Sequence, residues 1–162
     1  MLRAWNYERL EEKVYEATLD NGLQVYLLPK PGFRKTYATL TTRFGSIDHR
    51  FRVEDGDVVE LPDGIAHFLE HKMFEEEDGD VFHRFAQQGA SANAFTSFNR
   101  TAYLFSCTDR VKDNLLTLLD FVQRPYFTDE NVEKEKGIIG QEIRMYEDDP
   151  DWQVYFGLLQ SM

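Results

Sequence analysis

The first 45 positions contain two short apolar runs and one alternating segment, patterns that predict β-strands. Residues 14–19 and 23–28 are two apolar runs on either side of an Asp-Asn-Gly sequence, which is a strong signal for a β-hairpin. Residues 35–45 alternate and contain several β-branched side chains, so we expect a third strand. Residues 46–63 are polar and acidic, and we expect an ordinary loop there.

The remaining sequence changes to a helical period, with one pair of strands in between. We expect helices at 64–75, 81–88, 111–123 and 130–148, a further helix from about residue 151, and paired strands at 90–98 and 101–107. Asp63 and Asp80 are suited to cap the first two helices, and the acidic run at 75–78 predicts a solvated segment. Antiparallel strands mixed with several helices predict an α+β fold built in layers.

The first helix contains the sequence His67-Phe68-Leu69-Glu70-His71, which has the form H-x-x-E-H of the inverzincin signature. Because a helix has 3.6 residues per turn, His67, Glu70 and His71 lie on one face. Two imidazoles one turn apart can bind the same Zn²⁺. The alternative is that the three residues are ordinary polar groups on a solvated helix face.

The helix at 130–148 carries two carboxylates within its apolar stripe. Val132, Glu135, Ile139, Glu142 and Tyr146 recur at steps of three and four residues. An unpaired carboxylate on a buried face is costly, and a bound cation removes that cost. The alternative is that both glutamates lie at the stripe edge and pair with Lys or Arg. With the cation, His67, His71 and Glu142 form the two-histidine, one-glutamate set of a catalytic zinc site, and Glu70 is free to act as a general base.

Composition narrows the classes of function. The chain has 162 residues, enough for one domain with a real core, and a net charge of −11, which argues against binding nucleic acid or an anionic membrane surface. Cys107 is the single cysteine and lies in an apolar run, so we expect a core residue. The first residues contain no apolar signal sequence, and a cytoplasmic protein is the default. The final residues stop within an apolar pattern, which suggests a fragment of a longer protein.

Three motifs together resemble the insulinase/pitrilysin/mitochondrial processing peptidase family. They are the segment 64–71 with H-x-x-E-H, the segment Ser91-Ala92-Asn93-Ala94-Phe95-Thr96, and Glu135 followed by Glu142 seven residues later. The resemblance extends from about residue 14 to the end of the chain. The segment after Phe74 departs from the family, which usually has Gly-Thr there, and the loop at 46–63 is long.

The resemblance implies a two-layer sandwich of a mainly antiparallel β-sheet covered by α-helices, with one Zn²⁺ per chain. His67, His71 and Glu142 would be the metal ligands, Glu70 the base and Glu135 the second glutamate that supports the site. Ala92, Asn93, Ala94 and Phe95 would bind substrate as an added β-strand. The family implies an endopeptidase acting on peptides or unfolded polypeptide segments. Residues 1–162 would then be an N-terminal catalytic domain, truncated from a protein with a second homologous domain or subunit.

Several alternatives remain open from the sequence. The chain could be a non-catalytic partner subunit of the same fold, an unrelated structural or binding domain, or a different hydrolase with the same metal site. The His and carboxylate ligands also suit Mn²⁺, Fe²⁺ or Co²⁺. The sequence does not name a substrate.

Overall fold

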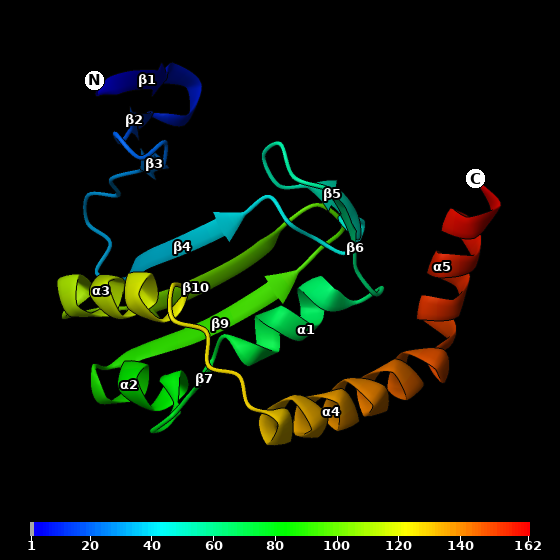
Figure 1. The fold of residues 1–162 in the computed structure, drawn as a ribbon. Coiled ribbons are helices and arrows are strands. Elements are labelled where there is room, and N and C mark those ends of the chain that lie inside the picture. The colour runs from blue at the N-terminus through cyan, green and yellow to red at the C-terminus, as the bar shows by residue number, and fades with distance from the viewer. Residues whose placement is uncertain (1) are drawn as a thin grey trace. The chain divides into compact units, whose positions relative to one another are not determined.

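The structure is a computed structural model that describes residues 2–162, and the chain separates into two compact units, Met1–Arg34 and Lys35–Met162 (Figure 1). The first unit holds a three-stranded antiparallel sheet in the order β1-β2-β3. Its elements are β1 (Arg3–Tyr7), a 3-10 turn η1 (Glu8–Leu10), β2 (Glu12–Thr18) and β3 (Gln24–Leu27). The predicted hairpin is therefore confirmed as β2–β3, with Gly22 at φ +86° in its turn, and β1 is an additional strand.

The second unit carries the candidate chemistry. Its strands are β4 (Thr36–Thr42), β5 (Arg50–Arg52), β6 (Val58–Glu60), β7 (Glu75–Glu76), β8 (Gly79–Asp80), β9 (Ala90–Thr96) and β10 (Thr101–Cys107). Its helices are α1 (Ile65–Lys72), α2 (Val81–Gln87), α3 (Val111–Phe121), α4 (Asp129–Glu147) and α5 (Pro150–Ser161). The main sheet is antiparallel in the order β4-β10-β9, and β5-β6 and β7-β8 are small hairpins.

Helices α1, α2 and α3 pack against the main sheet, and the core lies between these two layers (Figure 1). Side chains alternate along a strand, so Tyr103, Phe105 and Cys107 of β10 share one face of the sheet. They pack with buried residues that follow α1 or belong to α2 and α3: Phe74, Val81, Phe85, Leu118 and Phe121. Burying each large apolar side chain stabilises the fold by about 1.5–3 kcal/mol. The predicted two-layer α+β fold is confirmed, and so is the core position of Cys107.

The start of α1 differs from the prediction. Gly64, not Asp63, occupies the N-cap, and no side chain caps this helix. Gly64 has φ +82°, a left-handed conformation that glycine adopts without steric cost, and this places Asp63 one residue too early to cap. By contrast, Asp80 caps α2 as predicted, because its carboxylate accepts a hydrogen bond from the backbone N–H of Phe82.

The acidic run at 75–78 is not the uniformly solvated segment that the sequence predicts. Its first two residues form strand β7, where both are half-buried and paired with cations. Glu75 accepts a hydrogen bond from Lys72, whose side chain is fully buried, and Glu76 accepts one from Arg84 at 2.6 Å. Buried charges require such partners, and the sequence pattern could not show that cations would lie beside these glutamates.

Three other predictions on local structure need correction. The loop at 46–63 contains the hairpin β5–β6. On α2, the helical pattern predicts that Phe82 faces inward with Val81 and Phe85. In the structure Phe82 is 41% exposed and stacks on Phe74 with ring centroids 4.3 Å apart. On α3 the most apolar stripe starts at Val111 and includes Leu115 and Leu118. The face that is buried in the structure is a neighbouring one, and it consists of Asn114, Thr117, Leu118 and Phe121. Tertiary packing, rather than the most apolar stripe, selects the inward face here.

Helix α4 begins with a complete capping box, in which Thr128 and Asn131 exchange side-chain to backbone hydrogen bonds. Helix α5 follows directly, with Asp149 as its N-cap and Pro150 in its first turn. Within residues 2–162, no helix combines the length and the apolar character needed to cross a membrane.

Strand β9 is the edge of the main sheet, and its turn into β10 is tightly packed. Ser97 donates its backbone N–H to the carbonyl of Arg100 at 2.8 Å, so these two residues form a hydrogen-bonded pair at the end of the ladder. Gly45 lies against this turn, where an added Cβ would come within 2.4 Å of the carbonyl oxygen of Ser97. The absence of a side chain at Gly45 therefore permits the segment before β5 to approach the β9–β10 turn.

Candidate metal centre

Helix α1 presents His67 and His71 one turn apart on the side facing α4, as the H-x-x-E-H spacing predicts. The two imidazole rings are edge to face, with centroids 4.6 Å apart and planes at 80°. Both side chains are partly accessible, at 35% and 26% exposure. The helix therefore places both imidazoles on the same side and leaves them accessible to an incoming ion.

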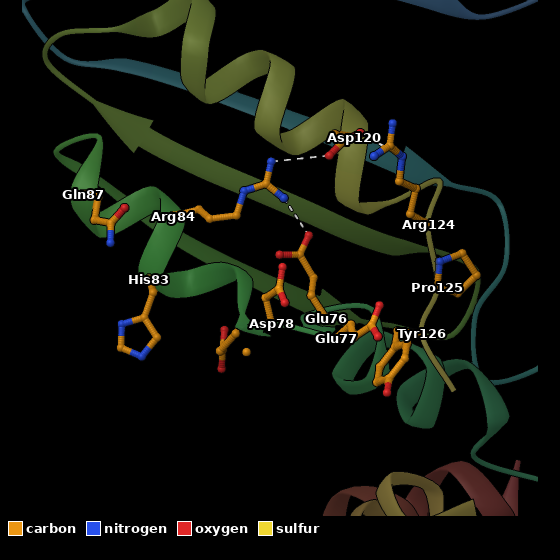
Figure 2. Close-up of a pocket in the computed structure, with 12 residues that line it drawn as sticks. Glu76, Glu77, Asp78, His83, Arg84, Gln87, Asp120, Arg124, Pro125 and Tyr126 are labelled. Atoms are coloured by element: carbon orange, nitrogen blue, oxygen red, sulfur yellow. Dashed lines mark hydrogen bonds and ion pairs between the residues drawn. The ribbon is translucent and has the colours of Figure 1, made fainter. Parts of the chain in front are cut away.

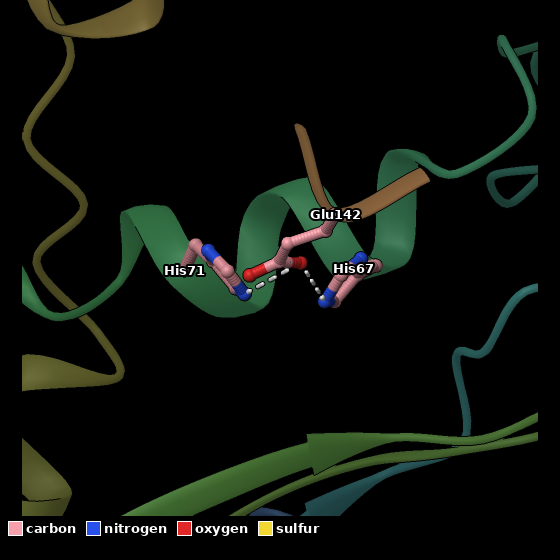
Figure 3. Close-up of side chains that lie close together, drawn as sticks. All are labelled: His67, His71 and Glu142. Atoms are coloured by element: carbon pink, nitrogen blue, oxygen red, sulfur yellow. Dashed lines mark ion pairs between the residues drawn. The ribbon is translucent and has the colours of Figure 1, made fainter. Parts of the chain in front are cut away.

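Helix α4 brings Glu142 opposite the two histidines (Figure 3). Its Oε2 atom lies 3.5 Å from Nε2 of His67 and 3.9 Å from Nε2 of His71. Ligand atoms of the three residues all lie within 4.8 Å of one another, and this is the one such group of three metal-binding side chains found within residues 2–162. The other two histidines, His49 and His83, are exposed and lie outside the cluster.

Glu135 lies about two helical turns before Glu142 on α4. It makes the closest polar contact to the cluster. Its Oε1 atom lies 2.8 Å from Nδ1 of His71, and Glu135 is only 7% exposed. A carboxylate accepts, so Nδ1 of His71 donates its hydrogen. This fixes the tautomer in which Nε2 of His71 has a free lone pair, directed toward Glu142.

Glu70 lies beside the cluster on α1 and is 8% exposed. Its Oε2 atom accepts a hydrogen bond from the hydroxyl of Thr96, at the end of β9, at 2.5 Å. Burial, and then the nearby negative charge of Glu70, raises the pKa of the Tyr103 phenol. Tyr103 therefore stays protonated over the ordinary pH range and does not supply a second negative charge next to Glu70.

The predicted substrate strand, 92–95, lies within β9 at the free edge of the sheet. Hydrogen-bonded and non-hydrogen-bonded pairs alternate in an antiparallel ladder, and the Ser97–Arg100 pair is hydrogen-bonded. Every second pair before Ser97–Arg100 is hydrogen-bonded, so Ala92 and Ala94 occupy non-hydrogen-bonded positions. Their N–H groups therefore point away from β10. The one on Ala94 is occupied by Oδ1 of Asn93, at 2.9 Å. The outward N–H of Ala92 is therefore available to another extended chain, whereas that of Ala94 becomes available only when Asn93 releases it.

A pocket of about 810 Å³ connects these features. Its wall includes Glu70, His71 and Glu135 of the cluster region, Asn93 and Ala94 of the edge strand, and the stacked ring of Phe74. A second pocket of about 660 Å³ shares Asp78, Gly79 and Asp80 with the first and extends to the site where Arg84 bridges Glu76 and Asp120 (Figure 2). The first pocket is the one in contact with the candidate centre.

The structure thus brings together His67, His71, Glu142, Glu135 and Glu70, all of which the sequence singled out. It also contains two features that sequence reasoning missed. Thr96 belongs to the segment 91–96, but the sequence assigned it no role, whereas in the structure it contacts Glu70. Lys72 has no predicted role in the first helix, although the structure buries it completely beside Glu75. A lysine directly after the second histidine, three residues before a glutamate, was the available signal for that pair.

Comparison with known proteins gives the family. The profile of the family described as Insulinase (Peptidase family M16) matches residues 50–161.

The chain belongs to the insulinase family, peptidase family M16. The resemblance drawn from its three sequence motifs is therefore confirmed. A Bacillus subtilis (strain 168) relative, described as the uncharacterized zinc protease YmfH, is 63% identical over 100% of this chain and 38% of its own length. An A-factor-processing enzyme of Saccharomyces cerevisiae (strain ATCC 204508 / S288c) is 26% identical over 90% of this chain and 14% of its own length.

Solved structures of the insulinase family share the fold. A crystal structure described as an M16-like peptidase from Alicyclobacillus acidocaldarius has a TM-score of 0.90 and 54% identity, and the match covers 98% of this chain and 37% of that one. Pitrilysin has the same fold at 21% identity, with a TM-score of 0.68 over 89% of this chain and 16% of its own. The chain thus spans little more than a third of the first relatives that it matches.

Proposed function

We propose that this chain is the catalytic part of a zinc-dependent endopeptidase. The observation that carries the proposal is the convergence of His67, His71 and Glu142 from two helices, with His71 oriented by Glu135. The zinc protease descriptions of its relatives support the same class of activity.

The donor set fits zinc. In a tetrahedral site with metal–ligand bonds of 2.0–2.2 Å, ligand atoms are about 3.4 Å apart. The separations of 3.5 and 3.9 Å from Glu142 to the two histidine nitrogens are close to that value, so small side-chain movements would suffice. Three protein ligands leave the fourth position open, which is characteristic of catalytic rather than structural zinc.

Zinc held there would supply Lewis-acid polarisation of a carbonyl and activation of water. Glu70 would accept a proton from the attacking water and deliver it to the nitrogen of the leaving amine as the C–N bond breaks. Glu135 would hold His71 in the required tautomer. The partial burial of this site limits competing water around the Glu70 carboxylate.

Substrate would bind as an additional strand along β9. The outward N–H groups of Ala92 and Ala94 would donate to carbonyls of an extended peptide, and the segment 92–95 would hold it beside the pocket. Such backbone recognition favours peptides and unfolded polypeptide segments because a folded chain has few free extended stretches. Asn93 would have to release the N–H of Ala94 when a substrate takes its place.

We further propose that residues 1–162 are the N-terminal catalytic domain of a longer protein with a second homologous domain or subunit. The one-third coverage of the relatives supports this. A cytoplasmic location and the absence of nucleic-acid or membrane binding stay predictions from the sequence.

The function is tested by incubating the full-length protein with a panel of unfolded peptides and small amides, before and after treatment with a zinc chelator. We expect cleavage of the peptides but not of the small amides, loss of cleavage on chelation and recovery when one equivalent of Zn²⁺ is returned. Cleavage that persists in the fully demetallated protein would contradict a zinc mechanism. Cleavage of the small amides alone would indicate a different hydrolase.

Changing Glu135 to Gln is expected to weaken zinc binding by about 10–100-fold, because a neutral amide supports the imidazole of His71 less well than a carboxylate. Competition with a fluorescent zinc chelator would measure this affinity. Glu133→Gln, which removes an exposed carboxylate on the same helix, is the matched control. Equal affinity in the two variants would show that Glu135 does not tune the site.

A further inference from the structure

Thr96 is the residue that contacts the Glu70 carboxylate most closely, through a hydrogen bond. The other contacts of Thr96 show which of the two groups donates the hydrogen. Thr96 Oγ1 lies 2.5 Å from Oε2 of Glu70 and 3.4 Å from Oγ1 of Thr101. Thr101 is 2% exposed, and its hydroxyl donates to the backbone carbonyl of Phe44 at 2.8 Å. Each hydroxyl has one hydrogen to donate. Because Thr101 uses its hydrogen on Phe44 and a carboxylate only accepts, the hydrogen of Thr96 belongs to Glu70.

This arrangement distinguishes the two oxygens of the carboxylate. Oε2 of Glu70 is occupied by Thr96, whereas Oε1 has no hydrogen-bond partner within residues 2–162. Oε1 is not among the fully buried atoms that lack a partner, so it is accessible from the pocket that Glu70 lines and can meet a ligand or a reacting group. A base held through one oxygen presents the other in a defined direction.

Thr96 also links two parts of the site that are far apart in sequence. It ends β9, two residues after Ala94 on the strand edge, and its side chain reaches Glu70 on α1. One hydrogen bond therefore links the end of the strand to the carboxylate on the helix. The packing of Gly45 against the turn that follows Thr96 fixes this end of the strand.

We propose that Thr96 is a positioning residue for Glu70: its hydroxyl holds Oε2, so that Oε1 faces the water that attacks a peptide bound along β9. This rests on the proposed function, in which Glu70 is the base and β9 binds the substrate. Thr96 touches neither the substrate nor the metal ligands in this role. Its loss should therefore slow the chemical step without weakening either zinc or substrate binding.

The test uses the full-length protein with Thr96→Val, which keeps the shape of the side chain but removes the hydroxyl, and Thr96→Ser, which restores a donor. We expect kcat to fall by about 10–100-fold in Thr96→Val, with KM within about twofold and zinc content unchanged, and to recover to within about threefold of wild type in Thr96→Ser. Thr39→Val, on the exposed side of β4, is the matched control and should leave kcat unchanged.

A crystal structure of Thr96→Val provides a readout that does not depend on activity. We expect the Glu70 carboxylate to rotate or to occupy two positions, while the His67, His71 and Glu142 side chains stay in place. Wild-type kcat in Thr96→Val, an effect on KM alone, equal losses in the valine and serine variants, or an unmoved Glu70 would each overturn the proposal. A wild-type protein without peptidase activity would instead refute the proposed function, and the crystal structure would still decide whether Thr96 positions Glu70.

Discussion

Replacing Glu70 with Gln in the full-length protein is expected to reduce peptide cleavage by about 10²–10⁴-fold while zinc remains bound. Glutamine has nearly the same shape and can still accept the hydrogen bond from Thr96, but it cannot take a proton from the attacking water. Steady-state cleavage of an unfolded peptide, together with metal analysis by mass spectrometry on the same preparation, would measure both quantities.

Glu130→Gln is a suitable control for this experiment, because it removes an exposed carboxylate in the first turn of α4, away from the cluster. Normal cleavage by Glu70→Gln would show that another group acts as the base. Loss of zinc in Glu70→Gln would place Glu70 among the metal ligands instead, contrary to the geometry in which His67, His71 and Glu142 converge without it.

Replacing His71 with Ala is expected to remove the bound zinc and to abolish cleavage. The change deletes one of three ligands and also leaves the buried carboxylate of Glu135 without its 2.8 Å partner. We expect metal content to fall from one zinc per chain to background in protein purified without chelator. An unpaired buried acceptor also costs about 1–3 kcal/mol, so the melting temperature should fall.

His49→Ala tests whether any histidine would have the same effect, since His49 is exposed and outside the cluster. Equal zinc content in wild type and His71→Ala would contradict the proposed ligand set. Absence of metal from the wild-type full-length protein, with both variants equally stable, would favour the reading of His67 and His71 as plain surface groups.

The residues that each helix contributes to the site were predictable from helical periodicity, and the family resemblance implied that the two helices converge. The spacing of His67, Glu70 and His71 fixes one face of α1, and the seven-residue spacing of Glu135 and Glu142 fixes one face of α4. Two carboxylates in an apolar stripe predicted a bound cation as their partner. In the structure both carboxylates face histidines of α1, and the cation stays a prediction.

The parts that were not predictable depend on contacts between distant segments. The hydrogen bond from Thr96 to Glu70 requires the end of β9 to meet α1, which no local pattern specifies. The inward face of α3 and the pairing of Glu76 with Arg84 are likewise set by neighbouring elements. At the start of α1, Asp63 has the right chemistry for a cap, but the left-handed conformation of Gly64 decides where the helix begins.

The proposed ligands lie on helices that are distant along the chain, with 70 residues between His71 and Glu142. An ion bound by both would close that long loop in the manner of a covalent cross-link. A link across a loop of this length lowers the conformational entropy of the unfolded chain by an amount worth about 4 kcal/mol. Whole domains are stable by only about 5–15 kcal/mol. The metal would therefore stabilise the packing of α4 against α1 as well as take part in catalysis. The same three side chains would serve both purposes.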